Sequence, residues 1–500
     1  MIEFKMLIGG EMCGAARGAT NKVTDPSTEE AFATVPRANA EDVKRACEAA
    51  RAAFDEGDWP RMAQKERMRL LLELADRLDA RSQELMELES RQAGVPIRKT
   101  TLMDIPVGLE IFRTMVNLSD FPRYEPLPWI DFPAISWNFV QREAIGVCGA
   151  ITAWNFPWMF TMWKSAPALV MGNTMVLKPA SYTPLTALVF AEEAQKLLPA
   201  GVINVITGAG GEVGSALCES PLVDKISFTG STDVGRQVQR MAAGTIKRVT
   251  LELGGKSAVI VCDDADLEIT VDAAIFAFLF NAGQACESGT RLLLDRKIAK
   301  DFKEAMLERL KLVKIGPTAD FDTTMGPVIS ASQRDVIEGY IKSGIDQGAR
   351  LLTGGKRPKG EEFAKGYWLE PTVFDNVRSD MKIFQEEIFG PVLAITEFDD
   401  LDQALKLAND SIYGLGGAVF TRDIQKGIDL AKRVRTGTMW VNDYHLLNAN
   451  APFGGYKQSG VGREMSVYAL KEFTEVKHIH VDQVGNNRDR KFWLDYVINR

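Results

Sequence analysis

One cysteine stands where a reactive thiol would be placed. An apolar helical run ends near Phe280, Asn281-Ala282-Gly283 follows, and Cys286 then lies among small and polar residues. Structural cysteines usually lie inside apolar runs, whereas a thiol on a loop at the mouth of a helix is accessible and can react as a thiolate. Cys286 is therefore our candidate nucleophile. A small core residue is the alternative.

Two polar residues could assist such a thiol. Glu252 ends a strand-like run and precedes Leu253-Gly254-Gly255, where a ligand can approach closely. If burial raises its pKa, this carboxyl group could serve as a general base. Asn155, within Trp154–Trp158, could donate its amide to an oxyanion while the rings exclude water. A solvated loop residue at position 252 and a turn former at position 155 are the alternatives.

Two glycine-containing loops could hold a phosphate. Gly208-Ala209-Gly210-Gly211 follows a strand-like run, but its spacing is not that of a dinucleotide fingerprint, and a plain turn explains it as well. Phe228-Thr229-Gly230-Ser231-Thr232 follows the next strand-like run and opens a helix, where backbone N–H groups suit a pyrophosphate. An ordinary helix N-cap is the alternative for Ser231 or Thr232.

These residues fall within a regular alternation of strands and helices that begins near residue 145. The strand-like runs are Gly146–Ala150, Thr174–Leu177, Val202–Ile206, Lys225–Phe228 and Arg248–Leu251, with helical runs at 184–198, 212–219 and 232–243 between them. Short connections in such an alternation predict a parallel, doubly wound sheet. Its ligands bind at the carboxyl ends of the strands, where Asn155, Lys178, Gly230 and Glu252 lie.

A second alternation begins near Ser257. Helices are expected at 266–282, 298–313, 331–347, 400–409 and 423–434, and strands at 291–294, 371–374, 391–397, 416–420 and 438–441. Before residue 145, short strands up to residue 35 precede helices at 41–54, 62–92 and 101–118. Cys286 lies in the first helix–strand connection of the second alternation.

The fold class is therefore α/β, with two doubly wound Rossmann-like domains and a small β extension. We predict a dinucleotide-binding domain from 1–124 and 145–254 and a catalytic domain from 255–471. The segments 125–144 and 472–500 are rich in aromatic or strand-forming residues and are expected to serve oligomerisation.

Composition narrows the class of protein. The 500 residues include 46% hydrophobic and 25% charged residues, as in an ordinary globular protein. The net charge of −8 argues against nucleic acid or an anionic membrane as a partner. The six cysteines lack metal-site spacing, and the three histidines give no metal site, so none is assigned. No signal-peptide pattern or membrane-length apolar run is evident, and a cytoplasmic enzyme is expected.

Several motifs taken together resemble the aldehyde dehydrogenase superfamily. They appear in that family's order and span most of the chain: Trp154-Asn155-Phe156-Pro157, Val176-Leu177-Lys178-Pro179-Ala180, Phe228-Thr229-Gly230-Ser231, Leu251-Glu252-Leu253-Gly254-Gly255-Lys256-Ser257, Gly283-Gln284-Ala285-Cys286, Glu386-Glu387-Ile388-Phe389-Gly390-Pro391 and Pro452-Phe453-Gly454-Gly455-Tyr456-Lys457-Gln458-Ser459-Gly460. Several motifs in one order are far more specific than any one of them.

The resemblance implies a role for each matching residue. Cys286 would be the nucleophile, Glu252 the general base, and Asn155 an oxyanion donor together with the Cys286 backbone N–H. Residues for NADP or NAD would be Lys178, Ser181, Trp154, Gly230, Ser231, Glu387 and Phe389. Residues of the aldehyde tunnel would be Trp158, Met159, Met162, Trp163, Leu447 and Phe453. Glu464 would be structural or part of a proton relay. The resemblance also implies a homodimer or homotetramer.

Two positions depart from the family pattern. Ser181 stands where many members that use NAD carry Glu, and it should admit NADP at least as well as NAD. Glu287, next to the nucleophile, stands where small or neutral residues are usual. An inward carboxylate would raise the thiol pKa, but we expect a side chain that is solvated or paired with Arg291.

The predicted function is oxidation of a hydrophobic aliphatic or aromatic aldehyde to its acid through a Cys286 thioester. A CoA-acylating enzyme is one alternative, but members of that kind typically lack the Glu at position 252. A catalytically silent protein on the same scaffold is another, and it need not keep both Cys286 and Glu252. Reduced-nicotinamide absorbance with aldehyde, with and without CoA, distinguishes the three.

Overall fold

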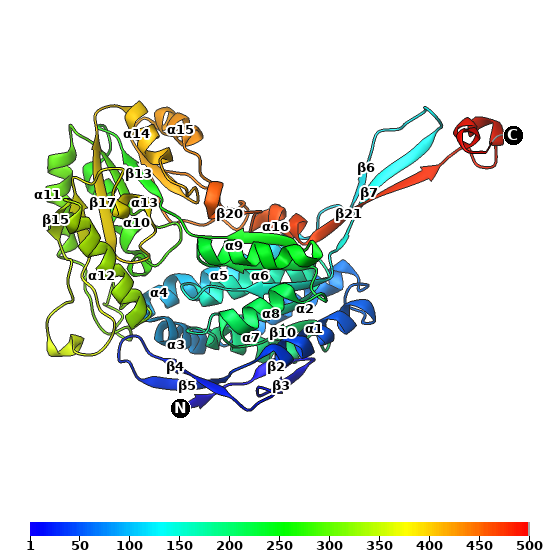
Figure 1. Ribbon diagram of the computed structural model, residues 1–500, viewed down its shortest axis with the longest axis horizontal. Coiled ribbons are helices and arrows are strands. Elements are labelled where there is room, and N and C mark those ends of the chain that lie inside the picture. Colours follow the sequence, from blue (N-terminus) through cyan, green and yellow to red (C-terminus); the bar gives the residue numbers. More distant parts are fainter. Residues whose placement is uncertain (499–500) are drawn as a thin grey trace.

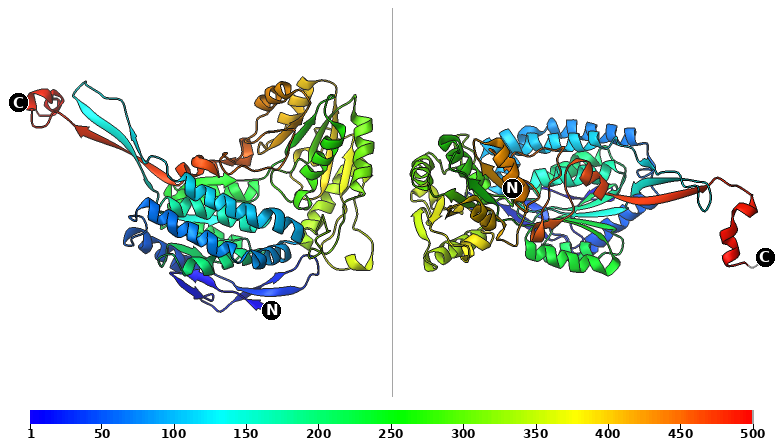
Figure 2. Two further views of the ribbon diagram at one scale, coloured as in Figure 1. Left: turned by 180° about the vertical axis from the view of Figure 1, so that it is seen from behind. Right: turned by 90° about the horizontal axis from the view of Figure 1, so that it is seen from above.

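A computed structural model describes residues 1–498 and shows two α/β bodies with a strand extension projecting from one side (Figure 1). The last two residues of the predicted segment 472–500 lie outside the described residues. No helix in the described range has the length and apolar character needed to cross a membrane. Figure 2 shows that the extension projects away from both bodies and that the described chain ends near its tip.

The first body is built on an eight-stranded sheet. In spatial order its strands are β20 (Gly460–Val461), β12 (Arg248–Glu252), β11 (Lys225–Thr229), β8 (Val147–Ile151), β9 (Thr174–Lys178), β10 (Ile203–Val205), β2 (Met6–Ile8) and β3 (Glu11–Cys13). The five strands predicted from the first alternation are its parallel centre. The prediction of a doubly wound sheet is therefore confirmed.

The helices of this body include one that the sequence analysis missed. The helices are α1 (Ala40–Asp55), α2 (Gln64–Asp79), α3 (Ser82–Ala93), α4 (Ile97–Lys99), α5 (Ile105–Leu118), α6 (Pro157–Val170), α7 (Leu185–Gln195), α8 (Ser215–Glu219) and α9 (Thr232–Ala242). The missed helix is α6, and each of its 14 residues is buried. A helix that is apolar all round has no polar face, so it lacks the periodicity by which helices are recognised in a sequence.

Two predicted helix boundaries also change. The helix expected over 62–92 is divided at Ala80-Arg81 into α2 and α3. The helix expected over 101–118 becomes a π-helical turn, Thr100–Asp104, followed by α5. Leucines at helical spacing continue across the first division, so periodicity alone could not reveal it.

The second body is built on a seven-stranded sheet. Its strands in spatial order are β15 (Arg350–Thr353), β16 (Thr372–Asp375), β17 (Val392–Phe398), β14 (Arg291–Asp295), β13 (Ala258–Val261), β18 (Gly417–Phe420) and β19 (Trp440–Val441). Its helices are α10 (Leu267–Leu279), α11 (Ala299–Leu310), α12 (Ala331–Asp346), α13 (Lys382–Gln385), α14 (Leu401–Asn409) and α15 (Ile424–Arg433). All strands but β15 run parallel to their neighbours.

The chain returns to the first body before it ends. β20 pairs antiparallel with β12, and α16 (Ser466–Glu472) contacts α5 and α6. The domain boundary at residue 471 stays a prediction. The extension is a sheet of β21 (Thr474–Asp482), β7 (Ser136–Ala144) and β6 (Tyr124–Pro126). A fourth, small sheet holds β1 (Ile2–Glu3), β5 (Ala31–Pro36) and β4 (Thr20–Thr24).

Candidate active site

Cys286 lies where two cavities meet. One cavity is lined mostly by apolar side chains, the other contains the carboxyl ends of β11 and β12, and Cys286 contributes to the lining of both. The residue is only 9% exposed, so the thiol is reached through these cavities rather than from the open surface. A nucleophile between two cavities can meet one ligand from each side.

An unusual backbone turn sets the position of this cysteine. After α10 ends, Asn281, Ala282 and Gly283 all have positive φ angles, of 57°, 54° and 72°. A Cβ at Gly283 would lie 2.1 Å from the carbonyl oxygen of Gly390, so no larger residue fits there. These three left-handed residues end the helix, and the loop after them is hydrogen-bonded to Asn155 of the first body.

Asn155 is fastened to the same loop. Its Nδ2 donates to the carbonyl of Gln284 at 3.0 Å, and Asn281 Nδ2 donates to the Asn155 carbonyl at 3.0 Å. Asn155 lies two residues before the start of α6 and is buried. Because an amide nitrogen carries two hydrogens, the second stays available for an oxyanion formed at Cys286.

Glu252 ends β12 in the second cavity. Burial, followed by the nearby Glu464 carboxylate, raises its pKa well above the ordinary value. Its Oε1 is buried and has no hydrogen-bond partner in the described part of the chain. Such an orphaned oxygen suits a water molecule or a bound ligand, because burying an acceptor without a donor is costly.

A buried ion pair lies behind Glu252. Lys164, on α6, makes an ion pair with Glu464 and donates to Ser227 Oγ at 3.0 Å. Ser227 Oγ in turn donates to Glu464 Oε1 at 3.1 Å. The family resemblance implies a structural or proton-relay role for Glu464. Lys164 is not among the predicted residues, because the sequence pattern does not reveal helix α6. The pair fixes α6 to the segment that carries β20.

The second cavity contains five of the residues expected to bind a coenzyme: Trp154, Gly230, Ser231, Glu387 and Phe389. Ser231 is the N-cap of α9, and its Oγ accepts from Val234 N at 3.4 Å. Glu387 Oε1 accepts from Gly255 N at 3.1 Å, and burial raises the pKa of Glu387 to about 7. The N-terminus of α9 and Cys286 thus both line this cavity.

Two further coenzyme candidates, Lys178 and Ser181, lie just beyond this cavity's lining at the carboxyl end of β9. Ser181 Oγ donates to the Gly208 carbonyl at 2.9 Å, so it lies beside the loop after β10. Lys178 Nζ donates to the Pro179 carbonyl at 2.9 Å, and burial lowers the pKa of its amine to about 8. The amine therefore remains mostly protonated at neutral pH.

The first cavity contains four of the six predicted tunnel residues: Met159, Trp163, Leu447 and Phe453. Trp158 and Met162 are also buried but do not line it. Trp158 Nε1 donates to the Ile105 carbonyl at 3.2 Å, which turns this ring toward α5. The cause is the helical period of α6, which places residues 159 and 163 on one face and 158 and 162 on another.

The structure overturns the expectation for Glu287. Its side chain is buried against the nucleophile rather than solvated, and Oε2 accepts from Cys286 Sγ at 3.2 Å. Its partner is His445, whose Nδ1 lies 2.9 Å from Oε1, and not Arg291, which donates to backbone carbonyls. Burial raises the pKa of the Cys286 thiol well above its usual range, and the charges of Glu287 and Glu252 raise it further.

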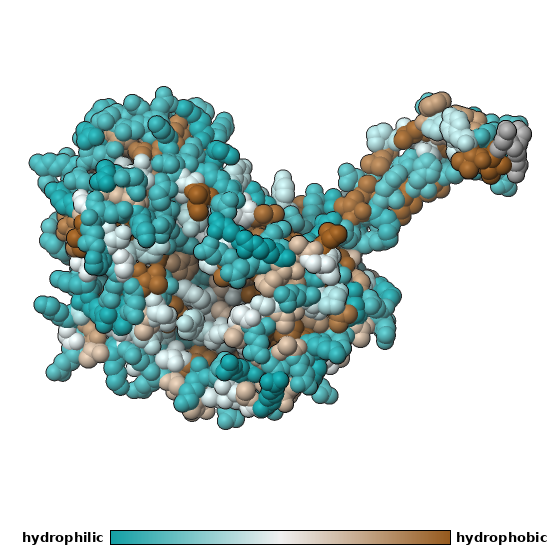
Figure 3. Space-filling view, in the orientation of Figure 1, coloured by the Kyte–Doolittle hydropathy of each residue, from teal (hydrophilic) through white to brown (hydrophobic). Residues whose placement is uncertain are grey.

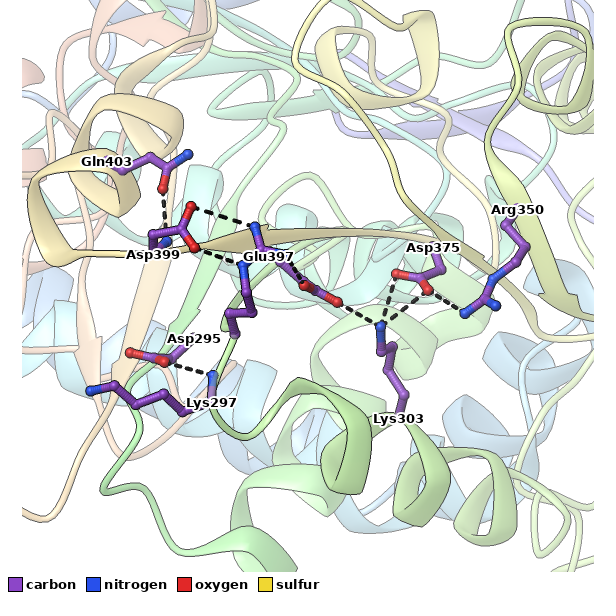
Figure 4. A network of polar contacts seen from close by, with 9 residues as sticks. Asp295, Lys297, Lys303, Arg350, Asp375, Glu397, Asp399 and Gln403 are labelled. Carbon is purple, nitrogen blue, oxygen red and sulfur yellow. Dashed lines mark hydrogen bonds and ion pairs between the residues drawn. The ribbon is translucent and has the colours of Figure 1, made fainter.

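The carboxyl edge of the second sheet is filled with paired charges (Figure 4). Lys303 Nζ lies 3.1 Å from Asp375 and 2.8 Å from Glu397, and Arg350 lies 2.6 Å from Asp375. Parallel sheets usually bind ligands at this edge. Here the carboxylates already have cationic partners, whereas the corresponding edge of the first sheet adjoins a cavity.

Comparison with known proteins supplies the family. The profile of the aldehyde dehydrogenase family matches residues 14–479. The chain belongs to the aldehyde dehydrogenase family. It is 43% identical to betaine aldehyde dehydrogenase of Bacillus subtilis (strain 168) over 480 residues, which cover 95% of this chain and 96% of that protein.

Solved aldehyde dehydrogenase structures are similar over nearly the whole chain. An NAD+ complex of aldehyde dehydrogenase from Bacillus cereus matches with a TM-score of 0.93 and 40% identity, covering 96% of this chain and 97% of that one. Betaine aldehyde dehydrogenase from Staphylococcus aureus in complex with NAD+ matches with a TM-score of 0.94 and 38% identity, covering 96% and 95%. The predicted family and α/β fold are confirmed. The protein is an NAD(P)-dependent aldehyde dehydrogenase that oxidises an aldehyde to its carboxylic acid.

Proposed function

We propose that Cys286 carries the reaction as nucleophile, with Asn155 and Glu252 in supporting roles. The observation that supports this most strongly is the position of Cys286 between an apolar cavity and a cavity that opens on the N-terminus of α9. Thiolate attack on the aldehyde carbon forms an oxyanion, which the Asn155 amide stabilises. After hydride loss a thioester remains, and Glu252 takes a proton from the water that hydrolyses it.

The second cavity fits a nicotinamide coenzyme, which supplies the hydride acceptor when bound. Gly230 and Ser231 at the start of α9 would face the pyrophosphate, because a helix N-terminus favours an anion. Trp154, Glu387 and Phe389 would hold the half nearer Cys286, and Lys178 and Ser181 the adenosine ribose. The domains predicted as dinucleotide-binding and catalytic would then meet at the coenzyme.

Ser181 is expected to let NADP serve at least as well as NAD. A serine hydroxyl is neutral and, by rotating its proton away from the Gly208 carbonyl, can donate to a 2′-phosphate oxygen, whereas a carboxylate there would repel the phosphate. Ser181→Glu should therefore lower kcat/KM for NADP by at least about tenfold, or 1.4 kcal/mol, and change NAD much less. Steady-state kinetics with both coenzymes measure this, with Ser181→Ala as the uncharged control. An unmodified enzyme that binds NAD well and NADP not at all would refute the role of Ser181.

Hydrophobic aldehydes, medium-chain or aromatic, are the proposed substrates. Five aromatic rings line the first cavity: Phe156, Phe160, Trp163, Phe280 and Phe453. Burial there stabilises an apolar substrate by about 0.8 kcal/mol per CH₂ group, whereas a substrate carboxylate would meet Glu287. We expect kcat/KM for octanal and benzaldehyde to exceed that for succinic semialdehyde by at least about tenfold. The opposite order would contradict this assignment.

A cationic aldehyde is the second candidate. The proteins similar to this chain include betaine aldehyde dehydrogenases of Bacillus subtilis and Staphylococcus aureus, and aromatic rings can bind a quaternary ammonium group. Two carboxylates, Asp104 and Glu287, also line the cavity. However, Asp104 lies 2.6 Å from Lys99 Nζ, and Glu287 is paired with His445. Since both carboxylates already have partners, a neutral substrate is favoured. Betaine aldehyde belongs in the same substrate panel.

A homodimer or a homotetramer built from two dimers is the proposed assembly. The extension exposes large apolar side chains, among them Trp129 (68%), Phe132 (76%) and Tyr496 (80%), and Figure 3 shows apolar surface along it. Within the described residues β21 pairs only with β7, which leaves its outer edge free for another strand. Sedimentation at micromolar concentration should show a species of at least two chains. A single monomer-sized species would contradict the proposal.

A cytoplasmic location remains a prediction of the sequence.

A further inference from the structure

The hydrogen bond of the nucleophile points away from the proposed general base. Cys286 Sγ donates to Glu287 Oε2 at 3.2 Å, and in the described part of the chain it makes no hydrogen bond with Glu252. The thiol proton therefore already lies between sulfur and the carboxylate of the next residue. This arrangement raises the question of which group removes that proton when sulfur attacks the aldehyde.

The contacts of His445 bear on the charge of Glu287. His445 Nε2 lies 3.0 Å from the Ala277 carbonyl, which can only accept, so Nε2 carries a hydrogen. Nδ1 lies 2.9 Å from Glu287 Oε1, so a further proton lies between these two atoms. Burial alone would raise the pKa of Glu287, but the hydrogen bond with His445 lowers it, so we assign the shared proton to the imidazole and the negative charge to Glu287. The aromatic rings of Phe276 and Phe280 lie 5.1 and 4.8 Å from the imidazole centroid, so the imidazole packs against both rings.

We propose that Glu287 is the group that accepts the Cys286 proton, and that His445 is the positioning residue that holds the positive charge beside it. This inference rests on the proposed role of Cys286 as nucleophile. The S–H bond breaks as an O–H bond forms on Glu287 Oε2, and the sulfur electron pair forms the bond to the aldehyde carbon. The negative charge moves across one hydrogen bond and stays near the same imidazolium. The proton transfer creates no additional buried charge. An additional charge would be costly in this buried site.

The protons moved during thioester hydrolysis are also accounted for, with Glu252 acting on the water molecule. During thioester hydrolysis, Glu252 takes a proton from water and later releases it to solvent. The departing sulfur recovers its own proton from Glu287 Oε2, which restores the resting pair. Glu252 and Glu287 thus serve different halves of the cycle. This division also explains why a carboxylate can stand beside the nucleophile although its charge alone disfavours a thiolate.

The test is the pH dependence of Cys286 alkylation by iodoacetamide without coenzyme. Only the thiolate reacts, and an internal acceptor makes its formation nearly independent of bulk pH. We expect the unmodified enzyme to vary less than about threefold between pH 6 and 8. In Glu287→Gln the rate at pH 7 should fall at least about tenfold and then rise about tenfold per pH unit, because the proton must leave to solvent. Glu252→Gln should keep the flat profile.

Other ionisable groups also lie near the Cys286 thiol, and the alkylation experiment distinguishes their effects from that of Glu287. Glu252 and Glu387 act on the thiol by charge, Tyr444 Oη donates to the Glu287 carbonyl at 2.6 Å, and Asp104 lines the cavity paired with Lys99. If Glu287→Gln instead speeds alkylation at pH 7, the carboxylate only repels the thiolate and the proposal fails. It also fails if the unmodified profile is steep, or if only Glu252→Gln becomes steep.

His445→Asn tests the positioning role, because an asparagine can still donate to Ala277 but cannot carry charge. We expect His445→Asn to show the same steep pH profile of alkylation as Glu287→Gln. The double variant, His445→Asn with Glu287→Gln, should be alkylated no more than about twofold more slowly than Glu287→Gln alone. If the rate reductions of the two single variants instead multiply in the double variant, His445 acts independently of Glu287, and its assignment as positioning residue is overturned. Thermal melting and coenzyme-binding fluorescence verify folding. Aldehyde oxidation that persists in Cys286→Ala would instead refute the proposed nucleophile, a separate failure.

Discussion

Cys286→Ala is expected to abolish aldehyde oxidation, lowering kcat/KM by at least about 10⁴-fold, because covalent catalysis has no other nucleophile at this point. Cys286 lines both cavities. The Asn155 amide donates a hydrogen bond to the carbonyl of Gln284, two residues before Cys286. Steady-state assays with octanal and NADP measure the loss.

The coenzyme provides the control for this substitution. The thiol holds no phosphate, so Cys286→Ala should bind NADP and NAD within about threefold of the unmodified enzyme, as followed by quenching of tryptophan fluorescence. The small side chain change should also leave the melting temperature close to the original value. Turnover at the original rate by a correctly folded Cys286→Ala protein would refute the whole thioester mechanism.

Glu252→Gln is expected to separate the two halves of the reaction. Removal of the general base should lower steady-state turnover by about 10²-fold or more. Acylation should continue, because the Cys286 thiol is hydrogen-bonded to Glu287 and not to Glu252. Stopped-flow absorbance should therefore show a burst of one reduced coenzyme per active site, and mass spectrometry should detect the acylated enzyme.

The two outcomes of this experiment assign different roles to Glu252. A burst with a stalled thioester supports a role in hydrolysis. Loss of the burst together with turnover would show that Glu252 is needed before the thioester forms. Adding CoA to the stalled enzyme gives a further comparison, since release by CoA would demonstrate thiol transfer in place of hydrolysis.

The sequence by itself determined the strand–helix alternation and most of the residues at strand ends. Strands in a parallel sheet are short apolar runs bounded by glycines and polar residues, so β8, β9, β10, β11 and β12 could be located within one or two residues. Because their carboxyl ends share one edge, Asn155, Lys178 and Glu252 were expected near one another. The motif order then indicated the family.

Local pattern could not reveal which side chains face one another across the bodies. Helix α6 was missed because it is buried on every side, and only its packing shows that Trp158 turns away from the cavity that Met159 lines. Likewise Lys164 and Glu464 pair across 300 residues of sequence. Side chains buried on all sides carry no local polarity signal that tells one face from another.

Glu287 shows most clearly what tertiary structure decided. In the sequence it is an acidic residue beside a cysteine, for which solvation or a bond to nearby Arg291 was the natural expectation. Folding brings His445, 158 residues away in the sequence, beside Glu287, while Arg291 donates its hydrogen bonds to backbone carbonyls. A buried carboxylate requires a compensating partner, and only the packing of the chain determines which residue supplies it.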